Sequence, residues 1–108
     1  MPTVNIFYTE QAKEFSDLSK KLKPYLAEKL SCGDKKLTPE EISIRLIQID
    51  EGDMIGRVEV EIKAHAFKER VEEQDEICND VRNYIMKKYP SLGDVRVWLI
   101  LSELGHSW

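Results

Sequence analysis

The stretch GRVEVEIKAHAF, residues 56–67, alternates apolar and polar residues with the period of two that a half-buried β-strand requires. One face is expected to carry Val58, Val60, Ile62, Ala64 and Ala66, and the other Arg57, Glu59, Glu61, Lys63, His65 and Phe67. Such a strand needs an apolar layer against one face, and the segments on either side of it predict that layer.

The segment after this strand predicts a helix from about Glu69 to Tyr89, which Pro90 and Gly93 end. Its apolar stripe is expected to point inward and to consist of Val71, Ile77, Cys78, Val81, Tyr84, Ile85 and Tyr89. The stretch DVRVWLILSEL, residues 94–104, follows as a strand that is apolar on both faces.

The first half of the chain repeats this order with nearly the same spacing. A strand is predicted over Pro2–Tyr8, then an amphipathic helix that Thr9 caps and that ends near Gly33. Pro24 lies inside this helix and is expected to kink or split it. The stretch EISIRLIQID, residues 41–50, predicts a second strand that is covered on both sides.

The element order is therefore β-α-β-β-α-β in a single α+β domain over residues 1–108, with two βαβ halves at about 1–50 and 56–104. Each half favours parallel strands joined by a crossover helix, so we expect a four-stranded sheet with two helices on one face. The other face would expose apolar side chains from two strands. Oligomerisation through that face is the natural remedy.

The composition and net charge argue against a protein that binds nucleic acid or an anionic membrane. The 108 residues are 42% hydrophobic and 33% charged with a net charge of −4, which is typical of a globular domain and gives no basic surface for nucleic acid or an anionic membrane. No export signal or membrane-spanning segment is visible, so we expect a cytoplasmic protein with free thiols at Cys32 and Cys78. Two cysteines and two histidines in unrelated positions predict no metal site, and no cofactor is expected.

The chain begins MPTVNIFY, and Pro2 at the start of a strand has two interpretations. Proline is tolerated there because it has no N–H to give to a sheet. Alternatively, removal of Met1 would leave Pro2 as the N-terminus, with a secondary amine that could act as a base.

Four pieces of the sequence together resemble the tautomerase superfamily, which includes 4-oxalocrotonate tautomerase, 5-carboxymethyl-2-hydroxymuconate isomerase and macrophage migration inhibitory factor. They are Met1-Pro2 before a strand, the stretch KLTPEEISIR at 36–45, Ile62-Lys63 before a helix, and RVW at 96–98 with the tail to Trp108. The resemblance implies a β-α-β-β-α-β subunit, a homotrimer whose sheets line its centre, and Pro2 as catalytic base. Residues 64–68 lack the glycine-rich loop common in the family, so a divergent branch fits about as well.

The same resemblance implies cationic side chains that hold a substrate carboxylate. Arg45 is the first candidate and Lys36 the second, while Lys63 and Arg70 are weaker choices. Arg45 has a competing interpretation as an ion pair across a subunit interface, with Glu59 or Glu61.

Three hypotheses for function remain open. The first is a small tautomerase that acts on 2-oxo or 2-hydroxydienoate carboxylates with Pro2 as general base. The second is a non-catalytic trimeric binding or scaffold protein with the same fold. The third is a ferredoxin-like ligand-sensing domain, which shares the element order and would be monomeric.

Overall fold

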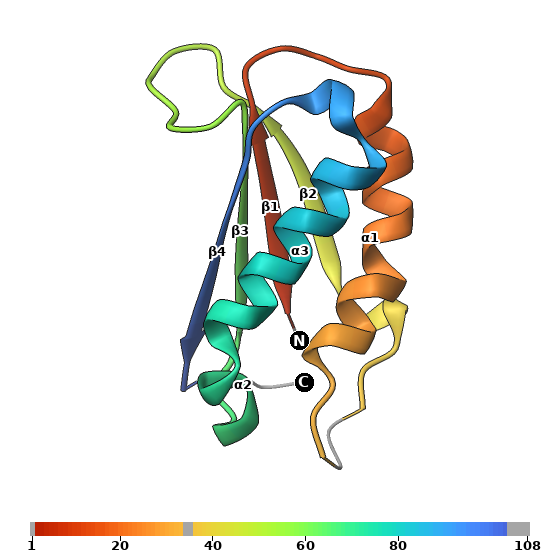
Figure 1. Ribbon diagram of the computed structural model, residues 1–108, viewed down its shortest axis with the longest axis vertical. Coiled ribbons are helices and arrows are strands. Elements are labelled where there is room, and N and C mark those ends of the chain that lie inside the picture. The colour runs from red at the N-terminus through yellow and green to blue at the C-terminus, as the bar shows by residue number, and fades with distance from the viewer. Residues whose placement is uncertain (1, 34–35, 104–108) are drawn as a thin grey trace.

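A computed structural model describes residues 2–33 and 36–103 (Figure 1). Within these residues, four strands, three α-helices and two short 3₁₀ helices follow one another in the order expected for two βαβ halves. They are β1 (Thr3–Tyr8), α1 (Glu14–Leu30), η1 (Pro39–Glu41), β2 (Ser43–Gln48), β3 (Val58–His65), α2 (Lys68–Glu72), α3 (Gln74–Lys88), η2 (Pro90–Leu92) and β4 (Val95–Ser102).

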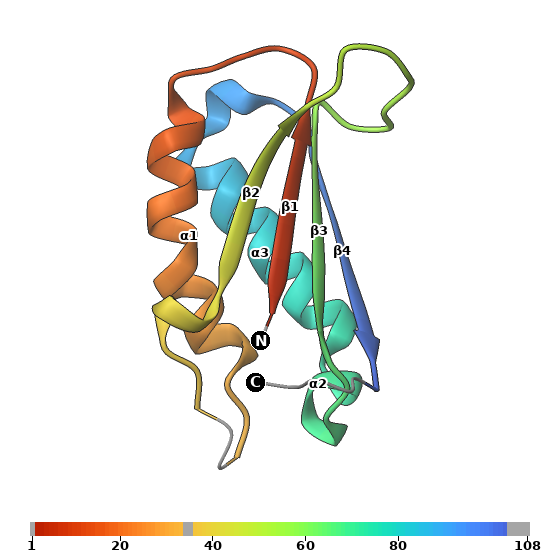
Figure 2. The same cartoon turned by 180° about the vertical axis from the view of Figure 1, so that it is seen from behind.

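The strands form one mixed sheet in the order β2-β1-β3-β4. β1 pairs in parallel with β2, and β3 pairs in parallel with β4, as each βαβ half requires. The two halves meet along the antiparallel β1–β3 pair in the middle of the sheet. Both long helices lie on one face, and the other face is open, as the two opposite views in Figures 1 and 2 show.

The core fills the space between the sheet and the helices. Val4 and Ile6 of β1 and Val60 and Ile62 of β3 have no exposed surface, so the predicted alternation is correct on both central strands. The helices contribute a continuous apolar stripe against these strands, which includes Phe15, Leu18, Leu22, Leu26, Leu30, Ile77, Val81 and Ile85. Cys32 and Cys78 are free thiols, as predicted.

The start and the middle of the first helix differ from the prediction. Thr9 does not cap it, because α1 begins at Glu14 with Lys13 as its N-cap residue. Pro24 neither splits nor ends the helix, which runs unbroken to Leu30. The proline lies on the exposed side of α1, where water can satisfy the carbonyl that loses its N–H partner.

The predicted second helix is two helices. α2 ends at Glu72 and α3 begins at Gln74, with Glu73 between them outside helical geometry. This break changes which residues point inward: Val71 is 53% exposed, whereas its neighbour Arg70 is 3% exposed. The expectation that Val71 is a core residue was therefore wrong.

The outer strand β2 is also more exposed than predicted. Ser43, Arg45, Leu46 and Gln48 are exposed, and no residue of β2 is fully buried, because this strand is an edge of the sheet. On β4, Trp98 and Ile100 expose 42% and 45% of their surface on the open face, in line with the predicted apolar outer side. None of the helices in the described part of the chain is long and apolar enough to cross a membrane.

Candidate functional site

Pro2 is buried immediately before β1. Its carbonyl oxygen accepts a hydrogen bond from the N–H of Ser43, 3.2 Å away, which continues the β1–β2 ladder by one residue. A proline fits this place because the ladder there uses its carbonyl and asks for no N–H. Met1 lies outside the described residues, and both interpretations of Pro2 stay open.

The sheet register fixes how the predicted cations lie relative to Pro2. Lys63 is opposite Thr3, next in sequence to Pro2, and Arg45 is opposite Asn5. At roughly 3.3 Å per residue, Arg45 is therefore about 10 Å along the sheet from Pro2. Of the cations predicted on strands, Lys63 lies closest to Pro2.

Alternation also places these residues on different sides of the sheet. Pro2 shares its side with the buried Val4, which faces the helices. Arg45 and Lys63 share theirs with Asn5 and Thr3 and point to the open face. Within one copy of the chain, the structure does not bring Pro2 and Arg45 together.

On the open face, both cations already have partners. Arg45 Nη1 donates a long hydrogen bond of 3.5 Å to Asn5 Oδ1, and Asn5 Nδ2 donates one of 3.1 Å to Glu61 Oε1. Lys63 Nζ lies 3.7 Å from the same Glu61 oxygen. Glu61 therefore balances the charge of Lys63, whereas Arg45 contacts only a neutral amide among the described residues.

Lys36 is exposed in the segment that leads into η1. Residues 34 and 35 before it lie outside the described part, and no described side chain forms a salt bridge or a hydrogen bond with the Lys36 ammonium group. Its predicted role stays a prediction.

Arg70 is one of the weaker candidates from the sequence for holding a carboxylate, and the structure buries it. Its Nε donates a hydrogen bond to the carbonyl oxygen of Leu30, and its Nη1 donates one to that of His65, both at 2.9 Å. The guanidinium also lies 4.8 Å from the centre of the Phe67 ring. Burial lowers the pKa of Arg70, and the nearby Cys32 partly opposes that shift.

A hollow opens on the exposed side of the sheet, over β1, β3 and β4. It has a volume of about 330 Å³, and its lining residues are Phe7, Glu59, Glu61, Trp98 and Ile100. A second hollow of about 230 Å³ shares Phe7 and Glu59 with it and adds residues of the β2–β3 loop, among them Glu51 and Asp53. The sequence predicts Glu59 and Glu61 on the polar face of their strand and an apolar outer side for residues 94–104, but it does not predict that these side chains enclose a hollow.

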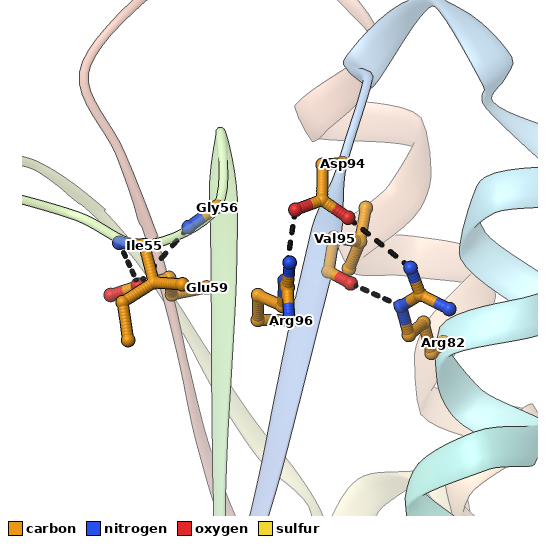
Figure 3. A network of polar contacts seen from close by, with 7 residues as sticks. All are labelled: Ile55, Gly56, Glu59, Arg82, Asp94, Val95 and Arg96. Atoms are coloured by element: carbon orange, nitrogen blue, oxygen red, sulfur yellow. Dashed lines mark hydrogen bonds and ion pairs between the residues drawn. The ribbon is translucent and has the colours of Figure 1, made fainter.

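Glu59 is held in position by the loop that precedes β3. Its Oε2 accepts hydrogen bonds from the N–H of Ile55 at 2.7 Å and of Gly56 at 3.4 Å (Figure 3). In the part of the chain that the structure describes, no lysine or arginine lies within ion-pair distance of this carboxylate.

A second polar group in Figure 3 surrounds Asp94, just before β4. Its carboxylate accepts hydrogen bonds from Arg96 Nε at 2.8 Å and from Arg82 Nη2 at 3.2 Å, and these two cations lower the pKa of Asp94. Arg82 Nε also donates to the carbonyl of Val95 at 2.7 Å. The cluster joins α3 to β4 and leaves Asp94 fully engaged.

Metal and cofactor sites were not expected from the sequence. Within residues 2–33 and 36–103, no three or more His, Cys, Asp or Glu side chains are grouped so that they could hold a metal ion.

Comparison with known proteins places the chain among solved structures only. Neither a protein-family model nor a curated protein gives a significant match to the sequence. A protein of unknown function from Vibrio cholerae O1 biovar eltor strain N16961 is 16% identical and superposes with a TM-score of 0.69, over 99% of this chain and 82% of that one.

Two further solved structures have a similar fold. The 5-carboxymethyl-2-hydroxymuconate isomerase from Deinococcus radiodurans R1 is 16% identical, with a TM-score of 0.58 over 99% of this chain and 87% of its own. A fused 4-OT wild-type symmetric trimer is also 16% identical, with a TM-score of 0.60 over 94% and 87%. At this identity the likeness shows a shared fold.

Proposed function

We propose that this chain, whose fold is that of the tautomerase superfamily, is a small tautomerase or isomerase that uses Pro2 as its general base. The substrates would be 2-oxo or 2-hydroxydienoate carboxylates. The reaction would remove a proton from the carbon next to the carbonyl and return it at another position.

The observation that carries this proposal is the burial of Pro2 at the start of a central strand. A free α-amino group titrates near 8 in water, and burial disfavours its charged form. Once Met1 is removed, a buried Pro2 would therefore be an unprotonated secondary amine at neutral pH. An amide nitrogen has no basic lone pair, so a retained Met1 would abolish this chemistry.

The substrate carboxylate needs a cation, and we propose that the site lies between copies of the chain. Arg45 and Lys63 point to the open face of their own sheet, away from the side of Pro2. A cation from a neighbouring copy, or Lys36 from the loop before η1, would complete the site. The dienolate that forms during the reaction would be stabilised by the same positive charge. We accordingly propose a cytoplasmic homotrimer.

The test begins with the intact mass of the protein, which establishes whether Met1 has been removed. Protein with a verified proline N-terminus is then assayed for ketonisation of phenylenolpyruvate. We expect turnover, and we expect the Pro2→Ala variant to lose about 100-fold or more of it. Thr3→Ser, one residue along the same strand, is the matched control and should keep the activity. A processed wild-type protein without turnover above background would exclude the function for this substrate class.

The contacts of the cations favour a second candidate. Lys63 is paired with Glu61, and Arg45 contacts Asn5, all on the face opposite Pro2. A trimeric binding or scaffold protein that keeps the fold without the chemistry would have this arrangement. It predicts a retained Met1, or an inactive protein that sediments as a trimer. Sedimentation as a monomer would instead favour a ferredoxin-like ligand-sensing domain.

A further inference from the structure

We infer that Arg45 of one copy of the chain seats in the acidic, aromatic hollow of the next copy and pairs there with Glu59. This assignment rests on the proposed trimer and takes Arg45 out of the set of substrate-binding residues. It follows from the charge pattern across the open face of the sheet.

The register places four side chains in one row across that face. Arg45 on β2 is level with Asn5 on β1, Asn5 with Glu61 on β3, and Glu61 with Trp98 on β4. The row therefore runs from a cation on one edge strand to an exposed aromatic ring on the other. Its two ends are complementary, because a guanidinium stacks well on an indole ring.

Arg45 is the exposed arginine that has no carboxylate partner among the described residues. The chain has five arginines. Arg57 pairs with Glu10, and Arg82 and Arg96 both pair with Asp94. Arg70 is buried against backbone carbonyls. Arg45 is exposed, and among the described residues it has no carboxylate within ion-pair distance.

The hollow, in contrast, has carboxylates without cationic partners among the described residues. Glu59, Glu51 and Asp53 contribute carboxylates to the two adjoining cavities, and in the described part of the chain none of the three is paired with a lysine or arginine. Glu59 is the best placed of them, because its bonds to the Ile55 and Gly56 N–H groups use one oxygen, Oε2. Phe7, Trp98 and Ile100 supply an apolar wall that would cover the stem of an arginine side chain.

Arg45 and the carboxylates of the hollow are not in contact within one copy of the chain. Arg45 and Trp98 are three strand spacings apart, about 14 Å. The cationic edge and the acidic hollow are different patches of the same face, so a head-to-tail contact between them can repeat around a ring. Three such contacts would close the proposed trimer and would cover the open face of each sheet.

A disulfide trap tests the contact directly. Arg45→Cys and Trp98→Cys are combined in one chain, which is then treated with diamide as the oxidant. A bond within one copy is excluded, because disulfides need Cα atoms closer than about 7 Å. We expect a covalent trimer on a denaturing gel. Each single-cysteine variant, treated in the same way, reports any background from Cys32 and Cys78.

Two outcomes would overturn the inference. One is a trimer by sedimentation that forms no covalent trimer with diamide, and the other is a product that stops at a covalent dimer. If the wild-type protein sediments as a monomer, the proposed assembly itself fails and the inference fails with it. Turnover of phenylenolpyruvate is measured separately: an active trimer that forms no covalent trimer overturns this contact alone and leaves the proposed function standing.

Charge reversal gives a second readout without new thiols. Arg45→Glu should weaken assembly about tenfold or more in sedimentation experiments over a range of protein concentrations. Adding Glu59→Lys to Arg45→Glu should recover part of the loss. Lys87→Glu makes the same change on the exposed surface of α3 and should leave assembly unchanged. Equal effects of Arg45→Glu and Lys87→Glu would contradict the specific contact.

Discussion

Arg70 Nε donates a hydrogen bond to the carbonyl oxygen of Leu30, the last residue of α1, at 2.9 Å. Through Nη1 the same side chain also holds the carbonyl of His65 at the end of β3. One buried guanidinium thus joins three elements, α2, α1 and β3, at the end of the sheet where β1 begins. It satisfies carbonyl groups that burial would otherwise leave without a partner.

Replacing Arg70 with Met should therefore destabilise the fold. Both carbonyl groups would lose their donor, and we expect the free energy of unfolding to fall by about 2–4 kcal/mol. Urea denaturation followed by circular dichroism measures the change. Lys68→Met removes an exposed cation from the same helix and should stay within about 0.5 kcal/mol of wild type. Equal stabilities of the two variants would argue against the buried clamp.

Pro24→Ala should make the protein more stable. Proline at this position gives no N–H to the helix, and α1 is continuous around it, so alanine would restore a hydrogen bond. We expect a gain of about 1–3 kcal/mol in urea denaturation. Glu28→Ala, exposed on the same helix, is the control and should change little. A loss of stability in Pro24→Ala would mean that the proline itself makes contacts that α1 needs.

Gly56→Ala should be destabilising for steric reasons. A methyl group at this position would lie 2.8 Å from Arg96 Cγ and 3.1 Å from the carbonyl oxygen of Asp94. The arginine can move, but the carbonyl is fixed because it accepts hydrogen bonds from the N–H groups of Arg57 and Val58. We expect a cost of about 1–3 kcal/mol.

The double variant Gly56→Ala with Arg96→Ala separates these two contacts. It removes the flexible neighbour and leaves the backbone one, so most of the loss relative to Arg96→Ala alone should remain. Full recovery in urea denaturation would show that the carbonyl of Asp94 yields.

Tyr89→Phe should reduce the dependence of stability on acidic pH. Tyr89 donates a hydrogen bond of 2.5 Å to Asp17, which is the main cause of the lowered pKa of this carboxyl, and Lys21 adds to the effect. Because the pKa is lower in the folded state, the carboxylate stabilises the fold above its unfolded pKa, near 3.9. That contribution is lost as the pH falls through the folded pKa.

The measurement for Tyr89→Phe is the urea midpoint between pH 3 and pH 7. The variant should show a shallower decline toward pH 3 than the wild type, and a lower midpoint at pH 7. Ser91→Ala removes an exposed hydroxyl that bonds to Glu14 nearby and serves as the comparison. An unchanged slope in Tyr89→Phe would assign the acid sensitivity to other carboxyls.

Much of the fold could be predicted because the central strands obey simple alternation. Val4 and Ile6 on β1, and Val60 and Ile62 on β3, are buried apolar residues at every second position. An apolar period of two is typical of a β-strand with one buried face. The equal spacing of the two halves then predicted the parallel pairs. Comparison with solved structures confirms the tautomerase resemblance at the level of the fold.

The helical break at Glu73 could not be predicted in the same way. The apolar residues from Val71 to Ile77 are spaced as in one continuous helix. No residue between them is a glycine or proline that would predict a break. Arginine is normally a surface residue. Arg70 is buried because its guanidinium donates hydrogen bonds to the carbonyl groups of Leu30 and His65, and the sequence does not show that these groups lie beside it. The position of Arg45 relative to Pro2 could not be predicted either. It depends on the register of β2 against β1, which places Arg45 opposite Asn5.

The antiparallel β1–β3 seam has a consequence for how the chain holds together. The loop between β2 and β3 is the covalent link between the two halves, and Ile55 in this loop is 74% exposed. A protease cut there would leave two βαβ fragments whose contacts with each other are all noncovalent. Folding of each subunit would then become a bimolecular reaction, and the stability of the subunit would depend on the concentration of the two fragments.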